Sequence, residues 1–286
     1  MVMILTGATS YLGKNFIKSF KKTDDLLCFV RKKSPEIKAR QEIVNFNEKK
    51  SFDGFVNKND VVVHIAGITD GTKKELFDVN YKITKNLVDV AKKKKARRFI
   101  FISSAIVEME EKGDYGESKL KAEEYIKKSG IEFIILRPSL IYGKGEKKFI
   151  GKIIYFINKY RIVPVIGNGK YSIRTVYAGD AVKIIEKSIY LKKRNKVYYV
   201  SSKDEISVNE RYKIIGELMK KRFLVFHVPI FFLKIASLFI RIFKKDFPSI
   251  QQLTRITKHE DYDVDNTEKD FKIKFKDFKE GIGESL

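Results

Sequence analysis

The sequence of 286 residues is poor in residues that form crosslinks or bind metals, with one cysteine and three histidines. Cys28 cannot form a disulfide within the chain, and no zinc-binding spacing can be made from so few sulfur and imidazole ligands. A disulfide-stabilised mini-protein is therefore excluded. Length and composition also exclude a peptide hormone and a collagen-like fibre. No metal site is expected.

No secretory leader is expected from the opening residues, and the sequence has no long uninterrupted apolar run. It begins Met1-Val2-Met3-Ile4-Leu5-Thr6-Gly7, without a charged region or a small-residue cleavage site. With the single cysteine, this predicts a cytoplasmic protein. The most apolar segment, Pro229 to Lys245, contains Lys234 and Arg241 and is too interrupted to span a bilayer. A buried helix is favoured there, and weak association with a membrane surface stays open because a basic stripe borders an apolar face.

Acidic residues are few relative to basic ones: 36 Asp+Glu stand against 59 Lys+Arg, a formal charge of +23. This excess raises the question of nucleic-acid binding. The basic residues are 47 lysines and only 12 arginines, scattered in short runs, whereas specific readout of bases and phosphates favours arginine. No basic stretch is interleaved with aromatic residues. We interpret the excess as a lysine-rich soluble surface with weak attraction to anions and no specific nucleic-acid partner.

Short apolar runs alternate with lysine-rich helical stretches through the first half of the chain, which is typical of a parallel sheet covered by helices. Strands are predicted at Val2–Thr6, Leu26–Val30, Ile43–Phe46, Val61–Ile65, Phe99–Ser103 and Phe133–Leu136. Helices are predicted at Leu12–Phe20, Lys73–Lys93 and Tyr115–Lys128. Residues 1–143 are thus predicted to form an α/β domain, a Rossmann-type doubly wound parallel sheet.

The pattern becomes less regular after Tyr142-Gly143. Helices are predicted at Lys147–Tyr160, Asp180–Tyr190 and Val208–Lys220, and short strands near Val163–Ile166, Val197–Val200 and Phe223–Val228. No linker rich in Ser, Gly or Pro separates the two parts. Residues 144–286 are expected to form a smaller mixed lobe, with some of their strands and helices contributing to the first domain; the family resemblance described below implies that this lobe binds the substrate.

A glycine-rich turn follows the first predicted strand and leads into the first helix. Gly7 permits the tight bend, a small residue at Ser10 lets the backbone approach a pyrophosphate, and Gly13 allows close packing of helix on strand. Such a turn is a weak signal alone, but its place between a strand and a helix predicts a dinucleotide-binding loop. The residues predicted to bind the cofactor in this turn are Gly7, Thr9, Ser10, Tyr11, Leu12 and Gly13.

The second predicted strand ends at Val30 and continues into Arg31-Lys32-Lys33. A site that prefers NAD would place Asp or Glu at this point to bind the ribose hydroxyl. Positive charge suits the 2′-phosphate instead, so Arg31 favours NADP over NAD as the cofactor. A solvated basic turn is the alternative.

Further motifs follow in order: Asp60 to Gly67, Asp78-Val79-Asn80, Ser103-Ser104, Tyr115-Gly116-Glu117-Ser118-Lys119 and Arg137 to Gly143. With the glycine turn, they resemble the extended short-chain dehydrogenase/reductase family, the NAD-dependent epimerase/dehydratase family, in its nucleotide-sugar branch. The resemblance covers most of the chain. It departs at Ser10, where the family usually has glycine. It implies cofactor contacts from Ala66, Asn80 and Pro138, and an adenine site flanked by Asn45 and Phe46.

Tyr-x-x-x-Lys pairs carry little information alone, because 14 tyrosines and 47 lysines produce roughly two by chance and the sequence has four. Only Tyr115 begins a helix shortly after a strand that ends in two serines. Lys119, one turn along the same face, would favour the phenolate of Tyr115, so Tyr115 is predicted as the acid/base. Lys119 is also expected to hold the nicotinamide ribose. Family alignment selects Ser104, rather than Ser103, as the hydrogen-bond partner of the reacting oxygen.

For two other residues, His64 and Arg174, a purely structural role is considered beside a functional one. His64 is expected to be a packed strand residue rather than a catalyst. Arg174, which precedes Thr175-Val176-Tyr177, matches a position where relatives bind the substrate diphosphate. A salt bridge that stabilises the lobe is an equal alternative for Arg174.

Ala105-Ile106 follow Ser104 at the point where family members that eliminate water carry acidic residues. Dehydration and decarboxylation are therefore disfavoured. The resemblance therefore leaves reduction of a 4-keto-sugar by hydride transfer, or 4-epimerisation like that of UDP-glucose 4-epimerase. Arg31 suits NADPH, and Leu140 stands where many epimerases carry an asparagine, so reduction is favoured.

Two classes other than an enzyme are also considered. A non-catalytic member that binds NAD(P) or RNA is disfavoured because the acid/base set is complete. A membrane-apposed accessory subunit is supported only by the apolar segment that follows Pro229. The sequence does not identify the sugar or its nucleotide, and a homodimer stays open.

Overall fold

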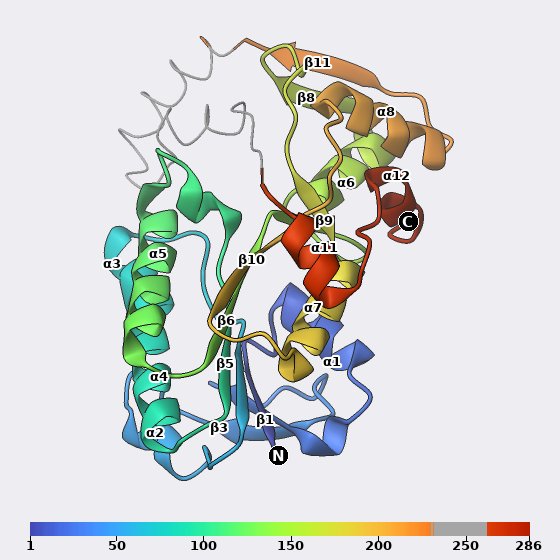
Figure 1. The fold of residues 1–286 in the computed structure, drawn as a ribbon. Coiled ribbons are helices and arrows are strands. Elements are labelled where there is room, and N and C mark those ends of the chain that lie inside the picture. The colour runs from blue at the N-terminus through green and yellow to red at the C-terminus, as the bar shows by residue number, and fades with distance from the viewer. Residues whose placement is uncertain (230, 232–261) are drawn as a thin grey trace. The chain divides into compact units, whose positions relative to one another are not determined.

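The computed structural model describes residues 1–229, 231 and 262–286, which divide into two compact units (Figure 1). Unit 1 comprises Met1–Pro138, Ala178–Val200 and Asp265–Ile273. Unit 2 comprises the described residues of Ser139–Tyr177, Ser201–Val264 and Lys274–Leu286. The expected domain boundary lay at residue 143, and unit 1 takes two segments from the later half of the chain. The apolar segment Pro229 to Lys245 lies outside the described residues except for Pro229 and Phe231.

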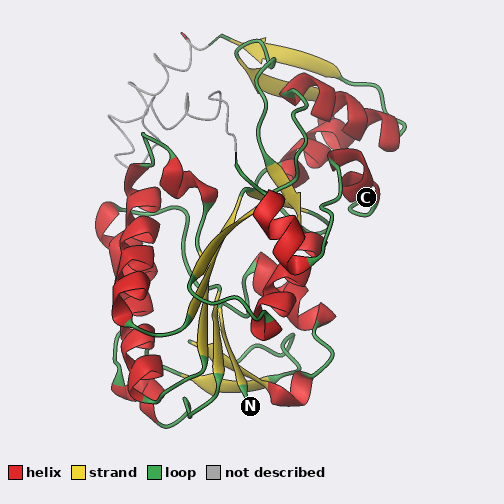
Figure 2. Cartoon of the chain, viewed as in Figure 1, coloured by secondary structure: helices red, strands yellow, loops and turns green. Residues whose placement is uncertain are grey.

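Unit 1 is built on a seven-stranded sheet in the order β10-β6-β5-β4-β1-β2-β3, and all neighbouring strands pair in parallel. Figure 2 shows these strands between two layers of helices. The sheet confirms the predicted doubly wound α/β fold. The strands are β1 (Met3–Thr6), β2 (Leu26–Val30), β3 (Arg40–Ile43), β4 (Val61–His64), β5 (Arg98–Ile102), β6 (Phe133–Pro138) and β10 (Lys196–Val200).

Helices cover both faces of this sheet, with α2 to α5 on one side and α1, α7 and α11 on the other (Figure 1). Two 3₁₀ turns and one π-helical turn lie among them. The helical elements of unit 1 are α1 (Tyr11–Ser19), η1 (Thr23–Asp25), α2 (Lys50–Asp53), α3 (Lys73–Phe77), the π-helix η2 (Asp78–Lys82), α4 (Ile83–Lys93), η3 (Ala105–Glu108), α5 (Gly113–Ser129), α7 (Ala178–Tyr190) and α11 (Asp265–Phe271). Apolar side chains of β2, β5, α4 and α5 share one core between the sheet and the first helical layer.

The central strands are buried along their whole length. Parallel strands covered on both faces are apolar without alternation, which is why apolar runs predicted them. The third strand was predicted wrongly at Ile43–Phe46, because the strand is β3, three residues earlier. As an edge strand, β3 carries polar residues, whereas Val44 and Phe46 enter the core from the loop that follows.

The helix predicted over Lys73–Lys93 is confirmed with the expected ends, and a π-helical turn lies within it. Thr72 and Glu75 form a capping box at the start of α3. The π-helical turn η2 separates α3 from α4 and changes the register of their faces. As a result Asn80, within η2, is fully buried.

The described residues of unit 2 form two short two-stranded parallel sheets and three helices. β7 (Leu140–Tyr142) pairs with β9 (Thr175–Tyr177), and β8 (Ile162–Ile166) pairs with β11 (Leu224–Val228). The helices are α6 (Ile150–Tyr160), α8 (Val208–Leu218) and α12 (Phe278–Gly283). The helices predicted near α6 and α8 and the strands predicted near β8 and β11 are confirmed. Within the described part of the chain, no helix is long and apolar enough to cross a membrane.

Candidate active site

The residues that the sequence selected in unit 1 follow the carboxyl ends of neighbouring strands. Arg31 follows β2, Gly7 follows β1, and Ser104 comes shortly after β5. β1 lies between β2 and β4, so the strand order reverses at this point. Open α/β sheets bind ligands at such a reversal, at the carboxyl ends of the strands.

The glycine turn packs tightly against the end of β4. Gly7 has a φ of 77°, and a Cβ at this position would lie 2.6 Å from the backbone nitrogen of Ala66, so only glycine fits. Ser10 is the N-cap of α1, and its hydroxyl accepts a hydrogen bond from the amide of Gly13 at 3.0 Å. The helix N-terminus, with the first-turn amides of Tyr11 and Leu12, favours an anion. The turn therefore fits a pyrophosphate, with a serine cap where the family usually has glycine.

Lys119 is 3% exposed. Its Nζ donates a hydrogen bond to the carbonyl oxygen of Ile102 at 2.9 Å and lies 4.7 Å from the centroid of the Phe101 ring. Burial lowers the pKa of Lys119 to about 8, and the negative charge of Glu123 opposes this shift. A Cβ at Gly67 would lie 3.1 Å from this Nζ, so a side chain at Gly67 would crowd the ammonium group.

Asn80 connects the loop after β4 to the helix that carries Tyr115. Its Oδ1 accepts from the amide of Ile68 at 2.9 Å, and its Nδ2 donates to the Ile68 carbonyl oxygen at 2.9 Å and to Ser118 Oγ at 3.0 Å. Ser118 Oγ in turn donates to the carbonyl oxygen of Tyr115 at 2.7 Å. The buried amide thus fixes the loop and the first turn of α5 together. The contribution of Ser118 was missed from the sequence.

Ser104 and Tyr115 lie on adjacent elements. Ser104 is half-buried and caps η3, its hydroxyl accepting from the amide of Ile106 at 3.4 Å. A Cβ at Gly116 would lie 3.3 Å from a side-chain methyl of Ile106, so the start of α5 packs directly on η3. Tyr115 is half-buried on the same helix as Lys119. The choice of Ser104 over its buried neighbour Ser103 stays a prediction.

A buried arginine also joins these elements. The guanidinium of Arg137, at the end of β6, binds both carboxylate oxygens of Glu123 at 2.9 and 2.6 Å. It also donates to Glu108 of η3 and, at 3.1 Å, to the hydroxyl of Tyr199. Glu123 is fully buried on α5, one turn beyond Lys119. Arg137 thereby fixes η3 and α5 to the sheet, a role that the sequence did not predict.

The other residues predicted to bind the cofactor in unit 1 differ in burial. Asn45 is exposed and donates to Glu48 Oε1 at 2.6 Å. The ring of Phe46 packs on Phe52 in the core, so its backbone rather than its ring remains for an adenine contact. Pro138 ends β6. Thr9 is exposed in the glycine turn.

Arg174 belongs to unit 2, where it is 5% exposed. Its Nη2 donates to Glu205 Oε1 at 2.9 Å and its Nη1 to the carbonyl oxygen of Ser202 at 3.2 Å. The structure therefore contains the salt bridge considered as the alternative for this residue. Binding of a diphosphate by Arg174 stays a prediction.

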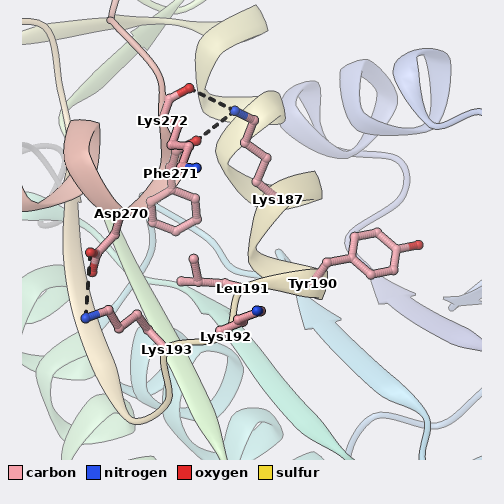
Figure 3. A pocket seen from close by; sticks show the side chains of 8 residues that line it. All are labelled: Lys187, Tyr190, Leu191, Lys192, Lys193, Asp270, Phe271 and Lys272. Carbon is pink, nitrogen blue, oxygen red and sulfur yellow. Dashed lines mark hydrogen bonds and ion pairs between the residues drawn. The ribbon is translucent and has the colours of Figure 1, made fainter.

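Figure 3 shows a pocket of about 390 Å³ between α7 and α11 that includes none of the predicted site residues. Lys187 Nζ donates to the carbonyl oxygens of Phe271 and Lys272 at 2.7 and 3.1 Å, and Lys193 pairs with Asp270 at 4.0 Å. These bonds hold α11 against α7. The pocket adjoins the start of β10, whereas the candidate site lies at the carboxyl ends of the strands. Among the described residues, no cluster of His, Cys, Asp or Glu could hold a metal ion.

A doubly wound sheet, a glycine turn at its order reversal and a buried lysine four residues after a tyrosine define a dinucleotide-binding protein of the short-chain dehydrogenase/reductase type. The family model described as the NAD dependent epimerase/dehydratase family matches residues 3–200. The chain belongs to this family.

Individual relatives are distant in sequence. The chain is 26% identical to the UDP-glucose 4-epimerase of Vibrio cholerae, over 93% of this chain and 88% of that protein. It is 24% identical to the UDP-2-acetamido-2,6-beta-L-arabino-hexul-4-ose reductase of Pseudomonas aeruginosa, over 77% of this chain and 56% of that one. Among solved structures, the UDP-glucuronic acid 4-epimerase from Bacillus cereus in complex with NAD matches with a TM-score of 0.78 and 16% identity, over 100% and 97% of the two chains.

The low pKa of Lys119 predicts a pH dependence of stability. Between the folded pKa of about 8 and the ordinary value of 10.5, the unfolded chain binds the proton more strongly, so this lysine makes folding more favourable as pH rises. We expect the unfolding free energy of the wild type, minus that of Lys119→Met, to increase between pH 7 and pH 10 by up to about 3 kcal/mol. Urea denaturation of both proteins at several pH values measures it. A difference independent of pH would contradict the assignment.

Proposed function

We propose that the protein is an NADPH-dependent oxidoreductase that reduces the 4-keto group of a nucleotide-activated sugar. One observation carries this proposal: the buried Lys119 ammonium, bonded to the Ile102 carbonyl oxygen, lies on the helix of Tyr115 at the carboxyl ends of the strands. A buried cation one helical turn from a tyrosine lowers the cost of forming the phenolate. The nucleotide-sugar substrate is supported by the relatives, whose names specify UDP-sugars.

The chain's own residues supply the proton transfer. A reduced nicotinamide, when bound, would supply the hydride that reduction of a ketone to a secondary alcohol requires. The Tyr115 hydroxyl donates its proton to the carbonyl oxygen, and the positive charge of Lys119 stabilises the phenolate that remains. Ser104 donates a hydrogen bond to the same oxygen and orients it. Solvent then returns a proton to Tyr115, so one ketone, one hydride and one proton yield one alcohol.

The residues that would hold the cofactor lie on the sheet's carboxyl side. The glycine turn and the N-terminus of α1 suit its pyrophosphate. Arg31, Lys32 and Lys33 are all exposed directly after β2. Three positive charges without a carboxylate favour the 2′-phosphate of NADPH over the free ribose hydroxyl of NADH.

Epimerisation is the second candidate, because the UDP-glucose 4-epimerase of Vibrio cholerae matches over more of this chain than the reductase does. The same acid/base set serves either reaction. An epimerase oxidises and then reduces its substrate, so it returns its cofactor unchanged, whereas a reductase consumes NADPH with every turnover.

This difference tests the proposal. We expect the purified protein to oxidise NADPH, with loss of absorbance at about 340 nm, in proportion to the UDP-4-keto-sugar consumed. Product sugars are identified by chromatography and NMR. Conversion of UDP-glucose to UDP-galactose without net change in the cofactor would establish the epimerase instead. Failure to bind either NADPH or NADH would refute both.

Tyr115→Phe removes only the hydroxyl that transfers the proton. We expect the rate to fall by a factor of about 10² to 10⁴ while the Kd for NADPH changes little. Tyr155→Phe is the matched control, because Tyr155 belongs to another Tyr-x-x-x-Lys pair, with Lys159 Nζ 2.9 Å from its exposed hydroxyl. Stopped-flow turnover and fluorescence titration give the two quantities. Retained turnover in Tyr115→Phe together with lost turnover in Tyr155→Phe would show that the wrong pair was chosen.

Arg31→Asp reverses the charge after β2. We expect preference to change from NADPH towards NADH, since the carboxylate repels the 2′-phosphate and can accept from the ribose hydroxyl. Lys22→Asp makes the same change in charge before the amino end of β2 and should leave the preference unchanged. The ratio of the two values of kcat/KM measures this. Equal use of both cofactors by the wild type would remove the role assigned to Arg31.

A further inference from the structure

His64, the last residue of β4, is fully buried and hydrogen-bonded through both ring nitrogens. Its Nδ1 lies 2.6 Å from Thr6 Oγ1, and its Nε2 lies 2.9 Å from Thr84 Oγ1. The ring also stacks on Phe101 at a centroid distance of 5.7 Å. His64 is therefore packed as expected, and both polar atoms of its buried ring have hydrogen-bond partners.

Thr6, His64, Thr84 and Asn80 form a series of hydrogen bonds, called the relay below. The partners fix the direction of every bond in it. Thr84 Oγ1 donates to the carbonyl oxygen of Asn80 at 2.6 Å, because a carbonyl can only accept. The hydroxyl proton of Thr84 is thus used, so Nε2 of His64 must carry a proton and donate it to Thr84. Nδ1 is then unprotonated and accepts from Thr6 Oγ1. Burial, and secondarily the positive charge of Lys119, lowers the pKa of His64 to about 3, which keeps this ring neutral.

One end of the relay reaches the glycine turn. Thr6 Oγ1, having donated to His64, accepts from the amide of Ala66 at 3.3 Å. That amide nitrogen is the atom that a Cβ at Gly7 would approach to 2.6 Å. The side-chain bonds of Thr6 thus add to the backbone pairing of β1 with β4 and tie His64 and Ala66 to the start of the glycine turn.

The other end reaches the loop beside Lys119. Asn80, whose carbonyl ends the relay, holds Ile68 through its side chain. Between Ala66 and Ile68 stands Gly67, at which a Cβ would lie 3.0 Å from Asn80 Oδ1 and 3.1 Å from Lys119 Nζ. The loop from Ala66 to Ile68 is therefore held at both ends, by Thr6 and by Asn80, and His64 connects these two residues through Thr84.

We propose that His64 is a positioning residue that holds the glycine turn and the loop of residues 66–68 in one register, and so preorganises the dinucleotide site. This inference rests on the proposed function, since the ligand is its dinucleotide. A preorganised site loses less conformational entropy on binding. Breaking the relay should weaken binding of the dinucleotide although none of the changed atoms touches it.

The sharpest test removes one hydroxyl from the middle of the relay. Thr84→Val keeps the shape of the side chain but can neither accept from His64 nor donate to Asn80, whereas Thr84→Ser keeps the hydroxyl and is the matched control. We expect the Kd for NADPH, from fluorescence titration, to rise about tenfold in Thr84→Val and to stay within about twofold of the wild type in Thr84→Ser.

A second readout reports the ring itself and needs no cofactor. Nitrogen-15 NMR of the wild type should show His64 neutral and protonated at Nε2 from pH 5 to pH 8. Thr84→Ser should retain this tautomer. Thr84→Val should lose it in favour of a mixture, because nothing then requires Nε2 to donate. If Thr84→Val does not fold, Thr6→Val and Thr6→Ser form the equivalent pair at the other end.

The outcomes separate the two proposals. Unchanged NADPH affinity in the valine variant, or a wild-type ring that is charged or protonated at Nδ1, overturns the role of His64 and leaves the proposed function intact. A wild type that binds no dinucleotide overturns the proposed function and this role together. Weaker binding in the valine variant only, with the tautomer change, supports both.

Discussion

The hydrogen bond from the Lys119 ammonium to the Ile102 carbonyl oxygen is the contact on which the candidate site depends. A buried ammonium is costly unless its protons have partners. This bond gives the charge a partner at the last residue of β5 and so fixes the face that α5 turns towards the strand ends. Tyr115, one turn earlier, takes its position from the same bond, because it is on the same helix.

A second buried charge fixes α5 one turn further on. Glu123 meets the guanidinium of Arg137 through both carboxylate oxygens, a geometry that restricts rotation as well as distance. With Lys119 bonded to β5 and Glu123 to β6, α5 is held to two adjacent strands through charged groups. Removing one member of such a buried pair costs more than the pair contributes, because the remaining charge is left without its partner. The intact Glu123–Arg137 pair therefore contributes little net stability, and its main effect is to fix the position of α5 beside the site.

The sequence predicted most of the elements of unit 1, because its central strands are buried on both faces and read as plain apolar runs. It misplaced β3, whose exposed edge position makes it polar. It also missed β7 and β9, each three residues long. It missed α12 as well, although the capping box of Asp277 and Glu280 is a sequence signal for the start of that helix. Short strands take their stability from their partners, which a local pattern does not contain.

Site prediction had a similar limit. Tyr115 and Lys119 were selected from four equivalent pairs by their place after a serine-ended strand, and the structure puts that helix against η3. The relay through His64, the amide contacts of Asn80 and the carboxylates around Arg137 join residues between 4 and 60 positions apart. Such contacts depend on side chains that only packing brings together. The spacing of apolar residues also does not predict the π-helical turn in which Asn80 is buried.

Cys28 gives the chain a practical property. It lies in the middle of β2 without exposed surface, and burial raises the pKa of its thiol to about 12. Thiolate is the species that reacts with alkylating reagents, so this sulfur should be nearly inert while the protein stays folded. Two cysteines introduced by mutation, one on each unit, would then be the reactive thiols. Fluorophores could be attached to chosen positions, and distances between the units measured in solution, without altering the native sequence elsewhere.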